Sequence, residues 1–146
     1  MSDRYRKTSH MIYECKYHIC WIPKYRYPIL TGQVALRVRE LVRQIAAANE
    51  VEIIAGSVSS DHIHLYVSIP PSLSVSKFVQ FVKGATSRKL QLEFDQIRKR
   101  YWGQHVWARG YFVATAGVVS DEMIQNYVRN QQEGKTDDED FQIVNP

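Results

Sequence analysis

The sequence has no apolar run long enough to cross a membrane. Its first ten residues, MSDRYRKTSH, contain no apolar stretch of the kind found in secretory signals. Internal repeats and interior linkers are missing too, so the 146 residues predict a single folded domain, which we expect over residues 1–134, followed by a flexible tail over 135–146. These absences favour a cytoplasmic protein with no membrane partner.

Cysteine is scarce, with only Cys15 and Cys20. They lie five residues apart in a stretch that alternates like a β-strand, so we expect them on opposite faces and unpaired. Reduced thiols fit a cytoplasmic protein. A zinc site built from Cys15, His18 and Cys20 is an alternative, but the spacing matches no usual set of zinc ligands, and we favour packing roles.

Acidic residues are few outside the tail. Asp137 to Asp140 supply four of the fifteen acidic residues and none of the nineteen basic ones, so residues 1–136 carry a net charge of +8. A domain this basic favours a polyanionic partner, and nucleic acid is the commonest one, although a merely solvated basic surface is an alternative. The acidic tail is expected to be disordered.

The hydrophobic pattern predicts the order β-α-β-β-α-β and a terminal helix. Strands are expected over 13–22, 51–58, 62–69 and 111–115; helices over 33–49, from Ser74 with a middle weakened at Gly84, and from Ser120 to Gly134; and a loop over 101–107. This is the α+β, ferredoxin-like arrangement, in which two helices cover one face of a four-stranded antiparallel sheet.

Two histidines interrupt the apolar strand in SSDHIHLYVSIPP. With a side-chain period of two, His62, His64 and Tyr66 share one face, while Ile63 and its alternate neighbours share the other. The apolar face must meet the helices, so the histidines are expected on the open face, close enough to bind one ion together. A purely structural role for this pair is the alternative, because the triplet His-x-His alone is a weak signal.

The last predicted helix carries a second candidate, in SDEMIQNYVRNQQEG. Tyr127 and Gln131 lie four residues apart and therefore project together beside an apolar stripe. A phenol can attack phosphorus and keep the bond energy in an ester, while an amide oxygen one turn away can complete a metal shell. Packing of Tyr127 and solvation of Gln131 is the alternative.

Three segments together resemble a known family: YHICWIPKYRYPIL, DHIHLYVSIPPSLSVSKFVQFVKGATSRKL and VWARGYFVATAGVVSDEMIQNYVRNQQ. The chain is similar over about residues 9–133 to the single-tyrosine, His-hydrophobe-His (HUH) transposases of small prokaryotic insertion sequences. The resemblance implies that His62 and His64 are paired metal ligands, Gln131 the third protein ligand and Tyr127 the nucleophile. It also implies a Mg²⁺ or Mn²⁺ cofactor, since two imidazoles and a hard amide oxygen suit zinc poorly.

The same resemblance implies the substrate and the assembly. Single-stranded DNA, folded into imperfect hairpins at the ends of the element, would be cut to a 5′-phosphotyrosine and a free 3′-OH. The family works as a homodimer in which the tyrosine helix of one subunit can complete the metal site of the other, and Gly117 lies where a hinge would be needed. The sequence nominates no general base for Tyr127.

Supporting roles follow from chemistry. Asp61 could orient His62 or cap the backbone of a turn. Lys83 and Arg88, with Lys24 and Arg26, are candidate phosphate contacts, and Tyr25, Tyr27, Tyr101 and Trp102 could stack on unpaired bases. Two other functions fit parts of the pattern: a ferredoxin-like single-stranded nucleic-acid-binding module without catalysis, and a metal-dependent phosphoesterase that uses water.

Overall fold

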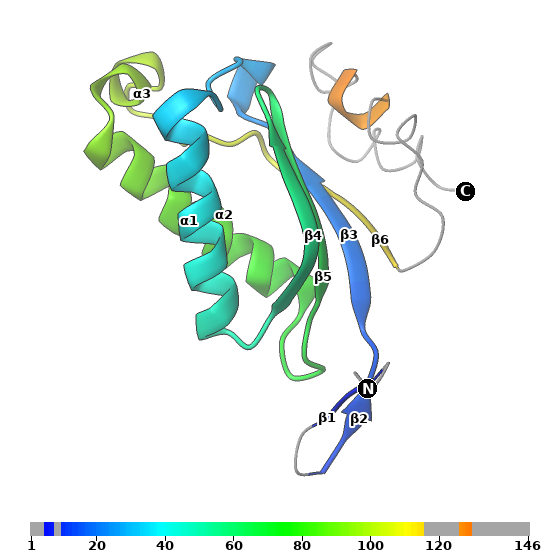
Figure 1. Cartoon of the computed structure of the whole chain (residues 1–146). Helices are drawn as coiled ribbons and strands as arrows, with labels where there is room; N and C mark the ends of the chain where they lie inside the picture. Colours follow the sequence, from blue (N-terminus) through cyan, green and yellow to red (C-terminus); the bar gives the residue numbers. More distant parts are fainter. Residues whose placement is uncertain (1–4, 8–9, 116–125, 130–146) are drawn as a thin grey trace.

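The computed structural model describes residues 5–7, 10–115 and 126–129, and their main feature is a four-stranded antiparallel sheet (Figure 1). Its strands are β3 (Lys16–Trp21), β4 (Glu52–Ser59), β5 (His62–Ser68) and β6 (Phe112–Thr115), in the order β4-β5-β3-β6. A separate two-stranded ribbon pairs β1 (Arg6–Lys7) with β2 (Ile12–Tyr13). The predicted ferredoxin-like order is therefore confirmed.

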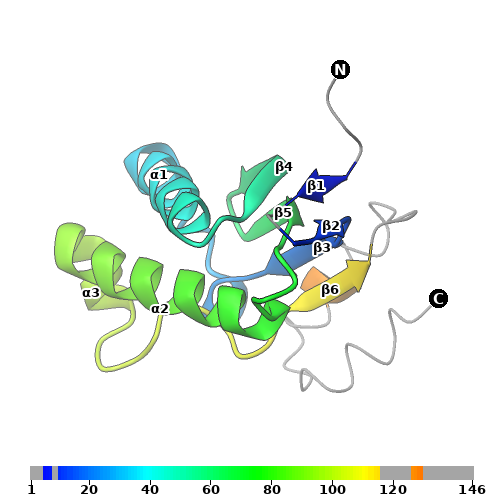
Figure 2. The ribbon, with the colours of Figure 1, turned by 90° about the horizontal axis from the view of Figure 1, so that it is seen from below.

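Helices cover one face of this sheet. The long helices are α1 (Gly32–Ala48) and α2 (Val75–Glu93), and the short ones are the 3₁₀ turn η1 (Lys24–Arg26) and α3 (Asp95–Arg100). Figure 2 shows α1 and α2 together on the same side of the strands. Among the described residues, no helix combines the length and the apolar character needed to span a bilayer.

The main core lies between these helices and the sheet. Ile63, Leu65 and Val67 of β5 point into it and are at most 5% exposed. Phe78 and Val82 of α2 meet them from the helix side and are fully buried. Burial of each such side chain contributes about 1.5–3 kcal/mol, so this face fixes which way β5 is turned.

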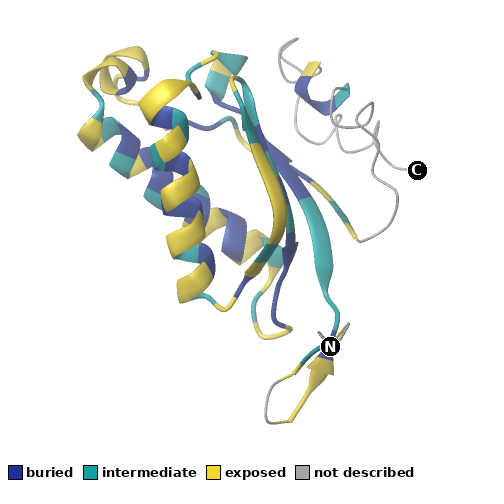
Figure 3. Ribbon diagram, viewed as in Figure 1, coloured by how far each residue is buried: buried dark blue, intermediate teal, exposed yellow. Residues whose placement is uncertain are grey.

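A second, smaller cluster lies on the other face of the sheet. Residues 126–129 form a helical segment there, and Tyr127 and Val128 are fully buried against Cys20, Ile22 and Phe112. Figures 1 and 3 show this segment, with its buried residues, beside the strands and opposite the helices. The face that the two main helices leave open is thus partly covered by the segment that carries Tyr127.

The four predicted strands and the first two predicted helices are present, with boundaries that differ by a few residues, and residues 126–129 of the predicted terminal helix are helical. The weak middle predicted for the second helix is wrong, because α2 runs unbroken through the exposed Gly84 to Glu93. A glycine costs a helix about 1 kcal/mol, which the buried face of α2 outweighs. The predicted cap is confirmed, since Ser74 accepts a hydrogen bond from the backbone N–H of Lys77.

Other predictions fall on parts of the chain outside the described residues. These are the hinge at Gly117, the ligand Gln131, both ends of the helix predicted from Ser120 to Gly134, and the tail over 135–146. The sequence pattern did not predict β1, β2 or α3.

Candidate functional site: the histidine face of the sheet

The predicted histidine pair lies on the sheet face opposite α1 and α2. His62, His64 and Tyr66 are half-buried, whereas Ile63 and Leu65 between them are buried in the main core. This alternation arises because successive side chains of a strand point to opposite faces. We call the surface that carries His62 and His64 the histidine face.

Pairing of the strands brings further residues onto the histidine face. In the register of β4, β5, β3 and β6, His64 is flanked by Ser57 and Cys20, and Cys20 is followed by Phe112. In the next row of the same face, Tyr66 pairs with His18. The central position of β3 therefore places His18 opposite Tyr66 and diagonally next to His64.

His18 contacts His64 through their ring nitrogens. The distance from His18 Nδ1 to His64 Nε2 is 3.1 Å, a hydrogen bond in which one nitrogen donates and the other accepts. The His18 ring also stacks on Tyr66, with centroids 4.4 Å apart. Burial lowers the pKa of His18 below its usual value, which favours the neutral imidazole at pH 7.

Asp61 connects His62 to a distant part of the chain. Its Oδ1 lies 2.9 Å from His62 Nδ1, and its Oδ2 accepts a 2.7 Å hydrogen bond from Arg26 Nε. Burial opposes ionisation, but the hydrogen bonds from His62 and Arg26 outweigh it and lower the pKa of Asp61. A carboxylate only accepts, so Nδ1 of His62 carries a proton and Nε2 keeps a lone pair. The predicted orientation of His62 by Asp61 matches this geometry.

Tyr127 packs onto the same face, next to the histidine row. Its ring lies 6.3 Å from that of Phe112, measured between centroids, and both belong to the cluster that includes Cys20. Because Cys20 also pairs with His64 in register, it is the member of this cluster that lies next to the histidines. Burial, with a smaller effect of the Asp61 charge, raises the pKa of the Cys20 thiol, so this cysteine is a packing residue and not a nucleophile.

Two of the three predicted protein ligands for a metal, His62 and His64, lie within the described residues. Over the ranges that the structure describes, no group of three or more His, Cys, Asp or Glu side chains is arranged to hold an ion. A site of two histidines completed by an amide would not form such a group, and Gln131 lies outside the described residues. The alternative zinc site at Cys15, His18 and Cys20 finds no support in this geometry.

The predicted DNA contacts have different surroundings. Lys83 Nζ donates to the backbone carbonyls of Ala108 and Gly110, at 2.7 and 2.8 Å, so it anchors the chain that leads into β6. Arg88 is exposed on α2, and Lys24 is half-buried in η1. Arg26, also predicted as a phosphate contact, instead forms the ion pair with Asp61.

Of the residues predicted to stack on bases, some are exposed and others are packed inside the protein. Tyr101 is fully buried in the main core, which rules out stacking on a base and corrects the prediction for this residue. Tyr25 and Trp102 are 58% and 78% exposed. The Tyr27 ring packs against Tyr101 and beneath the Arg100 guanidinium.

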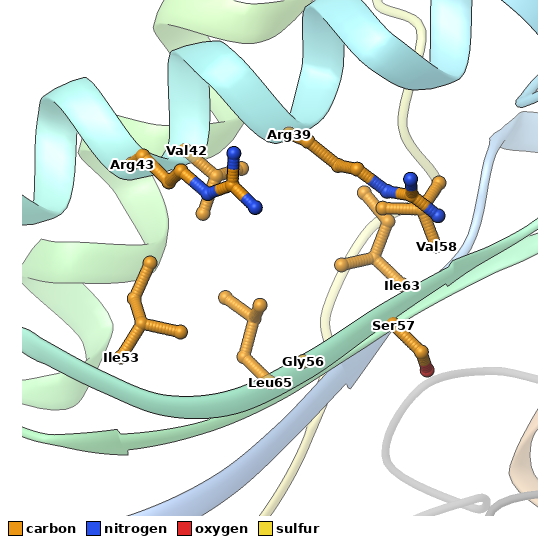
Figure 4. A pocket seen from close by; sticks show the side chains of 9 residues that line it. All are labelled: Arg39, Val42, Arg43, Ile53, Gly56, Ser57, Val58, Ile63 and Leu65. Carbon is orange, nitrogen blue, oxygen red and sulfur yellow. The ribbon is translucent and has the colours of Figure 1, made fainter.

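A hollow of about 310 Å³ lies on the other side of the sheet, between α1 and strands β4 and β5 (Figure 4). Arg39 and Arg43 extend over it from α1, and Ile53, Val58, Ile63 and Leu65 are among the apolar residues that line it. Ile63 and Leu65 alternate with the histidines along β5, so the hollow opens on the helix side. It is not part of the histidine face.

Sequence reasoning missed two participants, His18 and the pairing role of Arg26. His18 shares the side-chain parity of Cys20, and in a ferredoxin-like sheet the first and third of the four strands are neighbours in the centre. The predicted topology was therefore enough to place His18 beside His64. The Arg26 contact depends on a turn whose backbone no pattern in the sequence reveals.

Comparison with known proteins adds a family match. Residues 11–131 match the family described as "Transposase IS200 like". The chain is 33% identical over 128 residues to the ISDra2 transposase TnpA of Deinococcus radiodurans, covering 88% of this chain and 91% of that protein. It is also 33% identical over 141 residues to the IS200 transposase of Salmonella typhimurium, covering 97% of this chain and 92% of the relative.

Solved structures agree with the observed fold. A Deinococcus radiodurans chain, crystallised as a candidate transposase, superposes with a TM-score of 0.79 at 32% identity, covering 86% of this chain and 97% of that one. A REP-associated tyrosine transposase bound to a REP hairpin gives a TM-score of 0.56 at 16% identity, covering 92% and 75%. The second likeness shows the fold alone.

Proposed function

Because the chain belongs to the family of IS200-like transposases, we propose that it cleaves and rejoins single-stranded DNA at insertion-sequence ends. In this proposal Tyr127 forms a 5′-phosphotyrosine, assisted by Mg²⁺ or Mn²⁺. The observation that carries the proposal is that His62, His64 and the segment containing Tyr127 occupy one face of one sheet. The fold thereby places both histidines and the tyrosine segment on the same surface, where a site can form once the segment moves, within one subunit or between two.

The residues of the histidine face fit a divalent ion. Asp61 holds Nδ1 of His62, so the lone pair of Nε2 is available to a cation. His64 lies two positions along the same strand face, and Gln131 would supply a hard amide oxygen. When bound, the ion would offset the charge that develops on the scissile phosphate and the leaving oxygen.

The contact between His18 and His64 bears on ion binding. One lone pair cannot serve both a hydrogen bond and a cation, so an ion on His64 Nε2 requires the 3.1 Å bond to His18 to open. In this proposal His18 competes with the ion for His64 and is not itself a ligand.

Tyr127 acts as the nucleophile. Its phenolic oxygen forms the new bond to phosphorus and loses its proton to solvent. The 3′ oxygen leaves with the electrons of the broken bond and takes up a proton. Rejoining reverses these steps with a 3′-OH as the attacking group. Because Tyr127 is fully buried against Phe112 and its neighbours, the segment 126–129 must shift before a phosphate can reach it.

The DNA partner is proposed to be a hairpin formed by a single strand at each element end. The REP-associated transposase with this fold was solved with a REP hairpin, which supports a similar ligand here. Exposed Arg88 and half-buried Lys24 are the basic residues that we retain as candidate phosphate contacts. The nucleophile and the histidines are proposed to come from different subunits of a homodimer.

A covalent-trapping experiment tests the reaction. A labelled single strand carrying both element ends is incubated with the protein and Mg²⁺, and the mixture is then denatured. We expect a labelled protein band that disappears with Tyr127→Phe, with His64→Ala and with excess EDTA. Tyr111→Phe is the matched control, because it removes the hydroxyl of a different tyrosine, half-buried next to β6, and should keep the band.

Other outcomes would replace the proposal. Cleavage that persists in Tyr127→Phe without a covalent band would indicate a phosphoesterase that uses water. Metal-independent binding without cleavage would indicate a nucleic-acid-binding module.

Mixing two inactive variants tests the sharing of sites. Tyr127→Phe and His64→Ala subunits, each inactive alone, should together recover roughly a quarter of the wild-type covalent product, because a mixed symmetric dimer contains one intact composite site. The label should appear only on the His64→Ala subunit. No recovery after confirmed subunit exchange would place histidines and tyrosine of one site in the same chain.

A further inference from the structure

A turn that precedes α1 is connected to the histidine face by one carboxylate. Arg26 in η1 and His62 in β5 are 36 positions apart in the sequence, yet both bind Asp61, one at each oxygen. The side chains of Arg26 and Asp61 are each 22% exposed and that of His62 12%, so the three groups are largely shielded from water. We propose that Arg26 is a positioning residue for the His62 imidazole, acting through Asp61; this rests on the proposed metal-assisted function.

The chemistry of the three groups gives each a separate task. The carboxylate fixes the His62 tautomer with the proton on Nδ1 and the lone pair on Nε2, where a cation can use it. A carboxylate held by one imidazole alone could still rotate about its own side-chain bonds. The 2.7 Å bond from Arg26 Nε to the second oxygen removes that freedom, so Arg26 sets the angle from which His62 presents Nε2.

The backbone around Arg26 is strained in a way that a surface contact would not require. Tyr25 and Arg26 have φ of +63° and +54°, in the left-handed region that L-residues with side chains rarely occupy. Two such residues in succession are energetically unfavourable for side chains larger than that of glycine. Strain of this kind persists only where surrounding structure enforces it, and it is concentrated at functional sites.

Hydrogen bonds to residues 101–106 hold the turn in this conformation. The backbone N–H of Lys24 donates to the carbonyl of Val106 at 2.7 Å, and the buried Tyr101 hydroxyl donates to the carbonyl of Lys24 at 3.1 Å. Tyr25 donates its hydroxyl hydrogen to Gln104 Oε1 at 3.0 Å. These hydrogen bonds from the loop over 101–107 fix the position of η1, and this position allows Arg26 to reach Asp61.

The sign of the electrostatic effect makes the inference testable. If Arg26 were only a nearby positive charge, its removal would relieve repulsion and tighten cation binding. If Arg26 positions His62, its removal must weaken cation binding. Loss of a partner behind a metal-ligating histidine typically costs 10–100-fold in affinity, and we expect the lower end, about tenfold, for a residue that is one bond further away.

The test measures Mn²⁺ binding to the full chain without DNA. Electron paramagnetic resonance detects the free Mn²⁺ that remains at each step of the titration. We expect Arg26→Ala to raise the dissociation constant about tenfold. Arg43→Ala is the matched control, because it removes one positive charge from the helix side of the sheet and should leave Mn²⁺ affinity unchanged. Thermal unfolding of each variant confirms that it is folded.

A double-mutant cycle with Asp61→Ala tests whether Arg26 acts through the carboxylate. In the Asp61→Ala background, Arg26→Ala should cause no further weakening. Nitrogen-15 NMR of His62 gives a second readout: the fraction of the Nδ1–H tautomer should fall in Arg26→Ala and in Asp61→Ala, and remain high in Arg43→Ala.

Two results would overturn the inference. Unchanged or tighter Mn²⁺ binding by Arg26→Ala would show that Arg26 does not position His62, and equal weakening in both backgrounds would show that it does not act through Asp61. Failure of the proposed metal site is distinguishable, because then His64→Ala would also leave Mn²⁺ binding unchanged.

Discussion

His62 and His64 look equivalent in the sequence, but their partners in the structure differ in chemistry. His62 donates to a carboxylate that is itself held by Arg26, whereas His64 shares a hydrogen bond with a neutral imidazole. A charged acceptor gives a hydrogen bond about twice as strong as a neutral one. His62 is therefore fixed before an ion arrives, and His64 must exchange one partner for another.

Replacement of His18 by phenylalanine tests this exchange. His18→Phe keeps an aromatic ring to stack on Tyr66 but removes the nitrogen that contacts His64. A hydrogen bond of this kind contributes about 1 kcal/mol net, so its loss should tighten Mn²⁺ binding about fivefold. Titration of the DNA-free protein with Mn²⁺ measures the change.

The opposite result would identify His18 as a ligand. Weaker Mn²⁺ binding by His18→Phe, with an unchanged unfolding temperature, would mean that the 3.1 Å pair of nitrogens holds the ion jointly. Tyr66→Phe, which keeps the ring under His18 and loses only a hydroxyl, is the control expected to behave as wild type.

At the scale of elements, the sequence predicts an element best where a single effect, such as burial of one face, sets its hydrophobic pattern. Alternation along β5 follows from burial of Ile63, Leu65 and Val67 alone, so the face that carries the histidines could be predicted without the rest of the fold. The middle of α2 was misjudged because propensity at Gly84 was weighed without the packing that overrides it. Very short elements such as η1 carry no period, and their positions depend on tertiary contacts.

In the candidate site too, some residues could be predicted from the sequence and others depend on tertiary contacts. Family resemblance and spacing nominated His62, His64 and Tyr127, and the structure brings their elements to one face of the sheet. Spacing could not reveal that Arg26 would turn back to Asp61, since this depends on two left-handed residues that the sequence does not mark with glycine. It also could not show that Lys83 would be used to hold the chain before β6.

The helical segment over 126–129 should be the least firmly held part of the histidine face. Its buried contacts are those of Tyr127 and Val128 with Cys20, Ile22 and Phe112. Val128→Ala removes two methyl groups from this small cluster and should weaken docking of the segment by about 1–2 kcal/mol. Hydrogen exchange of the amides of 126–129 should accelerate accordingly, while exchange in α1 stays unchanged.

Arg129→Ala is the matched control. Arg129 follows Val128 in the same segment but is exposed, so its replacement should leave the docking of the segment unchanged. If the segment must leave the sheet before Tyr127 can react, Val128→Ala should also give at least as much covalent product as wild type in the trapping experiment. A faster exchange that abolished the product would mean instead that the docked position is the reactive one.

At the scale of the whole molecule, basic residues are distributed over two layers. Lys24 and Arg26 lie in the turn after β3, beside the end of the histidine face, whereas Lys83 and Arg88 belong to α2 in the helix layer. A DNA strand that contacts both Lys24 and Arg88, the two residues retained as phosphate contacts, must therefore pass around the edge of the β-sheet and not only across one face. The net charge of +8 over residues 1–136 provides long-range attraction to DNA regardless of this path.

Salt dependence separates a residue that binds phosphate from one that supports the fold. Arg88 is exposed, so Arg88→Ala should weaken binding of single-stranded DNA and reduce the slope of log K against log salt by about 0.7. Lys83 is bonded to the carbonyls of Ala108 and Gly110, so Lys83→Met should leave the slope unchanged and lower the free energy of unfolding by about 1–3 kcal/mol. Fluorescence anisotropy over a range of salt concentrations and urea unfolding measure the two effects. A reduced slope for Lys83→Met with normal stability would reverse the assignment, because the ammonium would then exchange its carbonyl partners for a phosphate when DNA binds.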